Sequence, residues 1–140
     1  MKIIKLILLS LILVGCGTSY DQTIEIESLG NQMKYNVPQI KASPGSTIQI
    51  IFSNNASMEV MKHNIVVLKT KEAIDEVGKA ALNAPNYLPE NPNIIAASQM
   101  IGPGETTELV VNLPAEKGVY PFICTYPGHY QVMQGKIVVE

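Results

Sequence analysis

The side chains best suited to bind a metal ion lie close together near the C-terminus. Cys124, His129 and Met133 follow one another in the pattern Cys-x4-His-x3-Met, and Pro127-Gly128 between the first two predicts a turn. The turn would fold His129 back beside Cys124 and leave Met133 placed for a longer, weaker contact. A thiolate, an imidazole and a thioether form a soft ligand set that suits copper.

The sequence contains only one other histidine, His63, which precedes Cys124 by 61 residues. Brought in on another strand, His63 would complete a plane of two histidines and one cysteine, with Met133 as a weak axial ligand. Both Cu(I) and Cu(II) tolerate three strong ligands and one weak one in nearly the same geometry. Such a site therefore favours rapid one-electron exchange.

Each of these residues alone has a simpler explanation. A single Cys in a strand is usually a small, buried apolar residue, a Met is usually part of the core, and one His can be structural. A thiol beside an imidazole could also act as a nucleophile with its base, but His63 would then have no role. Since both histidines, the thiol and a correctly spaced Met fit one site, the combination favours copper. No further histidine remains for a second, catalytic copper, so we do not expect an enzyme.

The N-terminal residues have the features of an export signal. Lys2 and Lys5 accompany an apolar stretch over residues 6–14, which is too short for a membrane span of about 20 residues. The end of this stretch and the two residues after it, Leu13-Val14-Gly15-Cys16, resemble the bacterial lipobox, in which the chain is cut before the cysteine and the thiol is diacylated.

We therefore expect residues 1–15 to be a lipoprotein signal peptide, cleaved before Cys16, and residues 16–22 to be a lipidated tether. The protein would be an exported bacterial lipoprotein, anchored to a membrane and facing the periplasm or the cell exterior. A plainly cleaved secreted protein and an uncleaved anchor are the alternatives.

Removal of the signal changes the charge and the cysteine count. The 140 residues contain 10 lysines and no arginine against 12 acidic residues, and the 125 residues after the signal would keep 8 lysines and a net charge of −4. The lysines are scattered, so no basic stripe for nucleic acid is expected. Cys124 would be the only free thiol, which excludes an intrachain disulfide and leaves an inert buried thiol, a nucleophile or a metal ligand.

The rest of the chain has the pattern of one β domain over residues 23–140. Short runs rich in β-branched residues alternate in polarity, and Gly and Pro pairs separate them. Residues 64–68 are nearly all apolar, which suits a strand buried on both faces. The expected strands are residues 23–27, 32–37, 47–52, 64–68, 108–113, 119–124 and 136–140. Seven or eight strands of this kind predict an all-β sandwich or barrel.

One stretch interrupts this pattern. Residues 71–82 place Ile74, Val77 and Ala81 at helical spacing, with Thr70 as the expected N-cap. A proline-containing loop follows over residues 83–93. We expect residues 70–93 to form a helical flap inserted between two strands.

The copper motif and its surroundings resemble the azurin branch of the cupredoxins. Because of the predicted lipid tether, the arrangement of the whole chain is similar to that of the auracyanins. The resemblance covers nearly all of residues 22–140 and implies a Greek-key sandwich that binds one blue copper ion. His63, Cys124 and His129 would be the trigonal ligands and Met133 the weak axial one. The segments that carry the resemblance are residues 32–36, 60–64, 94–104, 124–129 and 135–140, with the Met four positions after His129.

The resemblance also implies roles for neighbouring residues. Asn64 would tie the His63 segment to the loop around Cys124. Met33 and Met61 match positions in an apolar patch through which His129 would pass electrons, although each could also simply fill the core. Lys62 stands where azurins usually have a glycine whose backbone carbonyl is a distant fifth contact to copper, so that contact is left open. The azurin disulfide and core tryptophan have no counterparts here.

We therefore predict a membrane-anchored blue (type 1) copper protein that carries single electrons between redox proteins by cycling between Cu(I) and Cu(II). By resemblance, the expected partners are a c-type cytochrome and a membrane oxidase or reductase, and lipid would bind the chain to the membrane through Cys16. The alternative is an exported copper-delivery or copper-buffering protein that uses the same ligands. Such proteins more often have exposed sites rich in Met and Cys.

Overall fold

The computed structural model describes residues 18–140, so the predicted signal peptide and the lipidation site Cys16 lie outside the described residues. Within residues 18–140, no helix is long and apolar enough to cross a membrane. In chain order the elements are β1 (Gln22–Glu27), β2 (Gln39–Ala42), β3 (Thr47–Ser53), β4 (Val66–Leu68), α1 (Ala73–Ala81), the 3-10 helix η1 (Pro85–Tyr87), β5 (Ile94–Ala97), β6 (Thr106–Asn112), β7 (Gly118–Ile123) and β8 (Gln134–Val139).

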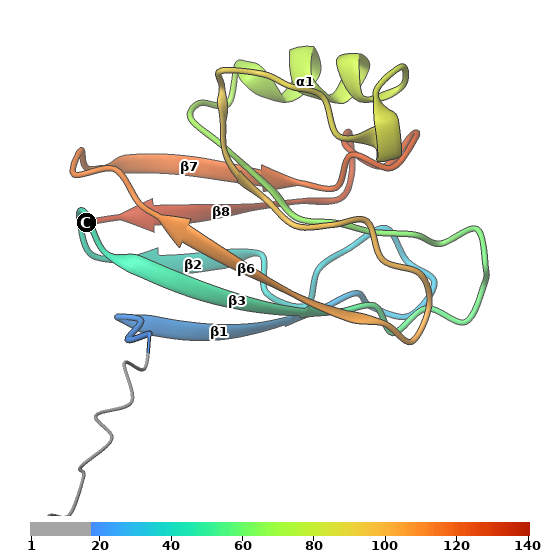
Figure 1. Cartoon of the computed structure of the whole chain (residues 1–140), viewed down its shortest axis with the longest axis horizontal. Coiled ribbons are helices and arrows are strands. Elements are labelled where there is room, and N and C mark those ends of the chain that lie inside the picture. Colours follow the sequence, from blue (N-terminus) through green and yellow to red (C-terminus); the bar gives the residue numbers. More distant parts are fainter. Residues whose placement is uncertain (1–17) are drawn as a thin grey trace, which may run out of the picture.

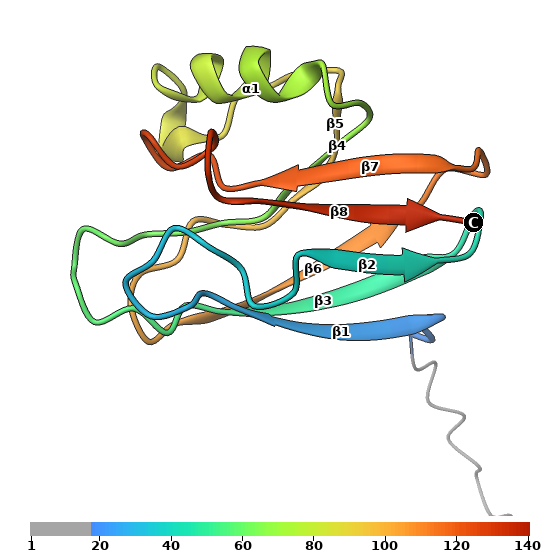
Figure 2. The same cartoon turned by 180° about the vertical axis from the view of Figure 1, so that it is seen from behind.

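The strands form two sheets that pack face to face (Figures 1 and 2). One sheet has the order β1-β3-β6 and the other the order β2-β8-β7-β4-β5. β1 is parallel to β3, and β2 is parallel to β8, whereas the other neighbours are antiparallel. Sequential strands therefore cross from one sheet to the other, as in a Greek-key sandwich, and the predicted fold class is confirmed.

The alternation of apolar residues places the main core between the sheets. Ile48, Ile50 and Phe52 of β3 are buried, and the residues between them are only half-buried. In β4 and the segment before it, Ile65 and Val67 face this core. The remaining residues of β4 are just as buried but belong to a second cluster on the outer face of the sheet. The prediction of a strand buried on both sides is therefore confirmed.

The flap covers that outer face. α1 and η1 lie between β4 and β5 in the chain, and α1 packs above the end of the five-stranded sheet that holds these two strands (Figure 2). Its residues Ala73 and Val77 are buried against Leu68 and Ile123. The prediction of Thr70 as N-cap was wrong: the helix begins at Ala73, and Glu72 occupies the cap position without a capping side-chain hydrogen bond.

Two strand assignments also differ from the sequence prediction. Residues 32–37 form no strand; they contain only an isolated bridge between Tyr35 and Ser28, and the local strand is β2, after Pro38. The reason is that Tyr35 is the only fully buried side chain of this segment, so no continuous face meets the core. β5 was missed because its four apolar residues show no alternation and lie half-buried at a sheet edge.

Candidate metal centre

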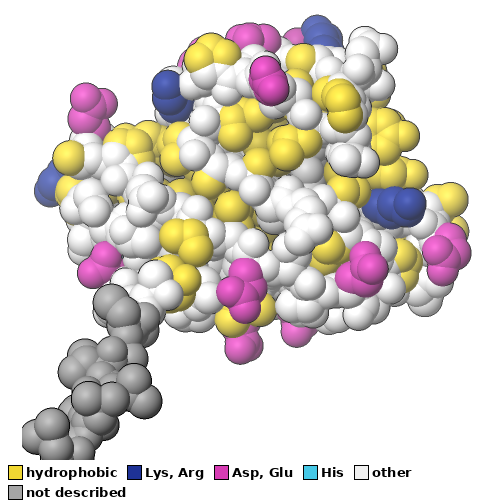
Figure 3. All heavy atoms as spheres, viewed as in Figure 1, with side chains coloured by type: hydrophobic (Ala, Val, Ile, Leu, Met, Phe, Trp, Pro, Cys, Tyr) yellow, Lys and Arg dark blue, Asp and Glu magenta, His cyan; other side chains and the backbone are white. Residues whose placement is uncertain are grey.

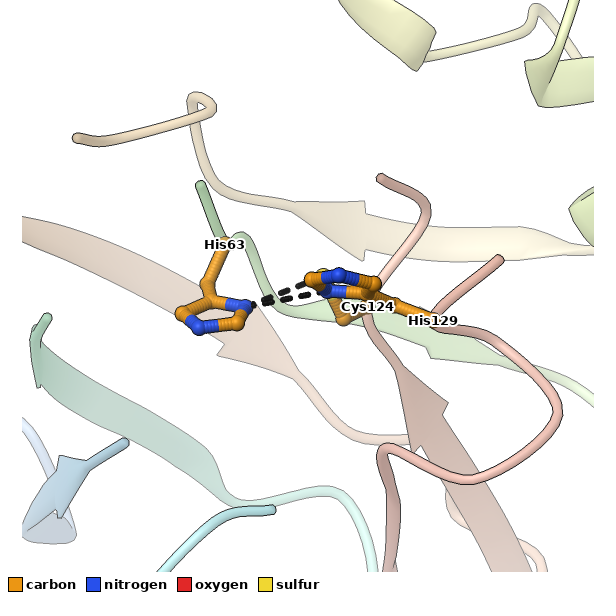
Figure 4. A group of neighbouring side chains, drawn as sticks. All are labelled: His63, Cys124 and His129. Atoms are coloured by element: carbon orange, nitrogen blue, oxygen red, sulfur yellow. Dashed lines mark hydrogen bonds between the residues drawn. The ribbon is translucent and has the colours of Figure 1, made fainter. Parts of the chain in front are cut away.

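Two segments far apart in the sequence bring three potential ligands together at one end of the sandwich. His63 lies in the segment before β4, Cys124 directly follows β7, and His129 lies in the loop that leads to β8. Their ligand atoms all lie within 4.8 Å of one another. The Nδ1 atoms of the histidines are 3.2 Å apart, and the Cys124 Sγ lies 3.8 Å from that of His63 and 3.6 Å from that of His129 (Figure 4).

This triangle has the size that a metal ion requires. A point equidistant from its three corners lies about 2.1 Å from each, which is close to the bond lengths of about 2.0–2.3 Å that nitrogen and thiolate sulfur form with a first-row metal. One thiolate and two imidazoles with a nearby thioether are the ligands that copper prefers in a trigonal site. The residues present therefore fit a copper ion.

Backbone pairing fixes the position of His63. The His63 N–H donates to the Ile101 carbonyl at 3.0 Å, and the Ile101 N–H donates to the His63 carbonyl at 2.9 Å. Asn54, which follows β3 and is fully buried, donates from its amide to the carbonyls of Met61 at 2.8 Å and Ile101 at 3.3 Å. These bonds hold the His63 segment to the end of the β1-β3-β6 sheet.

A tight turn fixes His129 relative to Cys124. The His129 N–H donates to the Tyr126 carbonyl at 2.9 Å, and Gly128 between them has a φ of 81°. Pro at the second position and a left-handed Gly at the third are the residues that a type II turn requires, so the turn predicted from Pro127-Gly128 is present.

Met133 is brought back to Cys124 by the backbone. The Cys124 N–H donates to the Met133 carbonyl at 3.1 Å, and the Met133 N–H donates to the His129 carbonyl at 2.8 Å. Met133 is completely buried in the main core together with Cys124. The structure therefore places the backbone of Met133 beside Cys124 and His129.

Asn64 joins the two ligand-bearing segments. Its Nδ2 donates to the Thr125 hydroxyl at 2.8 Å, and its Oδ1 accepts the Thr125 N–H at 2.8 Å. The Tyr35 hydroxyl donates to the Asn64 carbonyl at 2.6 Å from the other side. Because all three residues are buried, these bonds hold the neighbour of His63 against the neighbour of Cys124 without competition from water.

Burial keeps the metal-free ligands uncharged. Desolvation, with a smaller contribution from the nearby His129, lowers the pKa of His63 from 6.5 to about 4, and desolvation also lowers the pKa of His129. Burial raises the pKa of the Cys124 thiol from 9.0 to about 11, against smaller effects of backbone hydrogen bonds from Asn64 and Tyr126. Within residues 18–140 the His63 Nε2 is buried without a hydrogen-bond partner, so a proton on this nitrogen would have no acceptor to stabilise it.

The other predicted site residues lie nearer the surface. Met33 is 39% exposed, Met61 is half-buried and the Lys62 side chain is exposed. His129, in contrast, is only 5% exposed, and no histidine side chain is visible on the face of the described residues that Figure 3 shows. Sequence reasoning missed Asn54, Thr125 and the pairing partner Ile101, all of which hold the ligands in place. A polar Asn directly after an alternating strand was the available signal for Asn54, but its partners lie up to 47 residues away.

Comparison with known proteins agrees with this geometry. Residues 22–140 match the profile of copper-binding proteins of the plastocyanin/azurin family. Auracyanin-A of Chloroflexus aurantiacus is 42% identical over 123 residues, which cover 84% of this chain and 74% of the relative. Its structure, described as that of a "blue" copper protein, matches with a TM-score of 0.77.

This chain matches two further relatives over almost their full length. Azurin of Pseudomonas fluorescens biotype B is 32% identical over 135 residues, or 89% of this chain and 98% of the relative. The structure of dithionite-reduced auracyanin from Roseiflexus castenholzii is 38% identical, has a TM-score of 0.78 and covers 89% of this chain and 99% of its own. The protein is therefore an azurin-like cupredoxin with a site for one copper ion, and it belongs to the plastocyanin/azurin family of blue-copper electron-transfer proteins.

Proposed function

We propose that this protein carries single electrons between redox proteins while the acylated Cys16 holds it at a membrane surface. The observation that carries the electron-transfer part is the ligand triangle, in which three side chains from two segments already lie within 4.8 Å. Bound copper supplies the one-electron couple. The protein contributes ligands whose positions are fixed by hydrogen bonds, so little rearrangement accompanies a change of oxidation state.

The exposure of the ligands favours electron transfer over copper delivery. Cys124, His63 and Met133 are completely buried, and His129 is the ligand nearest the solvent. An electron can pass through the His129 ring without any movement of the chain. Delivery of copper would require an acceptor to replace buried ligands, for which the core of the sandwich would have to open.

The position of the tether agrees with a membrane anchor. β1 begins at Gln22, which pairs with Ile48 at the start of β3, whereas Asn54 at the end of β3 bonds to the His63 segment. A seven-residue strand spans about 23 Å, so the start of β1 and the end of β7, which Cys124 follows, lie at opposite ends of the sandwich (Figure 1). Copper would then face away from the membrane, toward partners such as a c-type cytochrome or a membrane oxidase or reductase.

The visible and EPR spectra of the copper-loaded protein test the copper function. We expect an intense blue colour from thiolate-to-Cu(II) charge transfer that bleaches reversibly on reduction, and its complete loss in Cys124→Ser. A colourless Cu(II) protein, or a blue Cys124→Ser variant, would refute the proposal. Slow electron self-exchange combined with fast transfer of copper to a metal-free acceptor would instead support delivery.

Membrane attachment needs a separate experiment, because copper binding does not depend on it. In a bacterial host the wild-type chain should incorporate labelled fatty acid and sediment with membranes. Cys16→Ala should remain unlabelled. Equal labelling of the two proteins would show that the proposed anchor is wrong.

A further inference from the structure

The helix of the flap contains a glycine that helix propensity does not explain. Gly78 lies in the middle of α1 and is buried, although alanine would be the better helix former at this position. A Cβ on Gly78 would lie 2.2 Å from the Cγ of Tyr130 and 2.3 Å from its Cδ2. The ring of Tyr130 therefore occupies the space that any larger side chain would need.

Tyr130 is the residue that directly follows the ligand His129. It is 8% exposed and belongs to the cluster beneath α1, together with Val77 and Ile123. Its hydroxyl donates to the Oδ1 of Asp75, also on α1, at 3.1 Å. The chain on the C-terminal side of His129 is thus attached to α1 by the buried ring of Tyr130 and by a hydrogen bond.

The flap also reaches the loop on the N-terminal side of His129, through Tyr126. The Tyr126 ring lies 5.0 Å from the His129 ring and 5.4 Å from the ring of Tyr87 in η1, in edge-to-face contacts. Asn86 and Tyr87 have φ values of 52° and 57°, a left-handed conformation that asparagine tolerates but that is unfavourable for tyrosine. Such strain persists only where surrounding contacts compensate for it, and here the Tyr87–Tyr126 contact is one of them.

We propose that the flap is a positioning device for the copper ligand His129. We call Gly78, Tyr130, Tyr126 and Tyr87 the flap clamp, because they hold the loop on both sides of the ligand. None of the four is assigned as a copper ligand; they act through His129. The inference rests on the proposed function only in taking His129 as a ligand.

The substitution Gly78→Ala tests the flap clamp because the two explanations of this glycine predict opposite signs. If only helix propensity mattered, alanine would raise the Tm of the metal-free full-length protein. The clamp predicts that the displaced Tyr130 ring lowers this Tm by about 5 °C or more. It also predicts altered EPR hyperfine splitting in the copper-loaded protein, since His129 would move with Tyr130.

A double variant and a helix control complete the experiment. In a Tyr130→Ala background there is no ring to displace, so Gly78→Ala should raise the Tm and leave the EPR spectrum unchanged. Ala80→Gly, at an exposed position of the same helix, should lower the Tm without altering the spectrum. If Tyr130→Ala does not fold, Tyr87→Ala releases the half-buried side of the clamp and should shift the spectrum in its place.

The outcomes separate this inference from the proposed function. A blue wild-type protein whose Gly78→Ala variant has a higher Tm and an identical EPR spectrum would overturn the clamp and leave the proposed function intact. A wild-type protein without blue colour would refute the proposed function. Even then, a lower Tm in Gly78→Ala that is reversed by Tyr130→Ala would support the hold of the flap on the loop.

Discussion

The two histidines of the copper centre are held in place by different means. Backbone hydrogen bonds to Ile101 and the buried amide of Asn54 fix the segment of His63, which is completely buried. His129, which is 5% exposed, lies in a loop that is held by one turn and by the packing of Tyr126 and Tyr130 against the flap.

The two histidine ligands are therefore held by different parts of the molecule. The backbone bonds and the amide network around His63 belong to the sandwich itself. His63, the inner ligand, therefore cannot move without partial unfolding, whereas His129 is the outer ligand. The neighbours of His129 are Tyr126 and Tyr130, which pack against Tyr87 and Gly78 of the inserted flap on the outer face of the sheet. Changes in the flap can therefore tune the outer ligand while the inner ligand and the thiolate remain in place.

The largest effect is expected at Asn54, which supports the inner ligand. Its Oδ1 accepts from the Ser28 hydroxyl and the Ala56 N–H, in addition to the two bonds that its amide donates. Asn54→Ala would leave several buried groups without partners, and we expect the free energy of unfolding to fall by about 4 kcal/mol. Urea denaturation of the metal-free protein measures this value.

Asn31 provides a matched control for Asn54. Its side chain also makes several hydrogen bonds, to Ser57 and to the Met58 N–H, but it is exposed. Because water can replace these bonds, Asn31→Ala should cost about 1 kcal/mol or less. Equal losses at Asn31 and Asn54 would contradict the idea that burial makes the inner support stronger.

The next largest effect is the response of the metal-free protein to acid. Burial lowers the pKa of His63 to about 4 and also lowers that of His129, so both rings are neutral in the folded state where the unfolded chain is already protonated. The unfolded state then binds more protons, and stability is highest above pH 6.5 and falls as the pH drops toward 4. For His63 alone the loss is about 3 kcal/mol.

Thermal unfolding between pH 7.5 and 4 tests this dependence. Gln substitutions of the two histidines should flatten the curve, and His63→Gln should flatten it more than His129→Gln because His63 is the more deeply buried ring. A Tm that does not change over this interval in the wild-type protein would show that the rings are not kept neutral by burial.

Asn64→Ala should have an intermediate effect on stability. Asn64 joins the His63 segment to the loop around Cys124. The substitution removes two buried hydrogen bonds to Thr125 and leaves the Thr125 N–H without an acceptor. We expect a loss of about 2 kcal/mol in metal-free stability. We also expect broadened EPR features in the copper-loaded protein, since the relative position of His63 and Cys124 is less well defined.

Thr125→Ser is the control for this network. Serine keeps the hydroxyl that accepts from Asn64 and the backbone N–H that donates to it, so the copper spectrum should stay the same. A spectrum that changes as much in Thr125→Ser as in Asn64→Ala would mean that packing, and not the hydrogen bonds, sets the geometry.

The same two regions show how far the sequence predicts the site. The ligands Cys124, His129 and Met133 could be predicted because one short loop contains them, and the turn at Gly128 has a sequence signature. The supports could not be predicted in the same way. The contact of Gly78 with Tyr130 joins residues 52 positions apart, and a glycine in a helical pattern carries no sign of the ring that it accommodates.

The fold shows the same limit. Strands with one buried face, such as β3 and β6, were predicted to within about two residues because their alternation is local. The predictions for β5 and for residues 32–37 were wrong because their structure depends on distant parts of the chain. β5 forms at an open edge of the sheet, and residues 32–37 meet the core only through Tyr35.

The smallest effect is expected at Tyr87, where the outer support carries its own strain. Tyr87→Ala removes the ring that contacts Tyr126 but keeps a side chain at a φ of 57°, whereas Tyr87→Gly removes the ring and also relieves the backbone. The glycine variant should therefore be more stable than the alanine variant by about 1 kcal/mol. Both variants should show the same change in the copper EPR spectrum, because only the ring reaches the ligand loop. Urea denaturation and EPR of the two proteins would separate strain from positioning: a spectrum altered by alanine alone would mean that the backbone of η1, and not the aromatic contact, acts on His129.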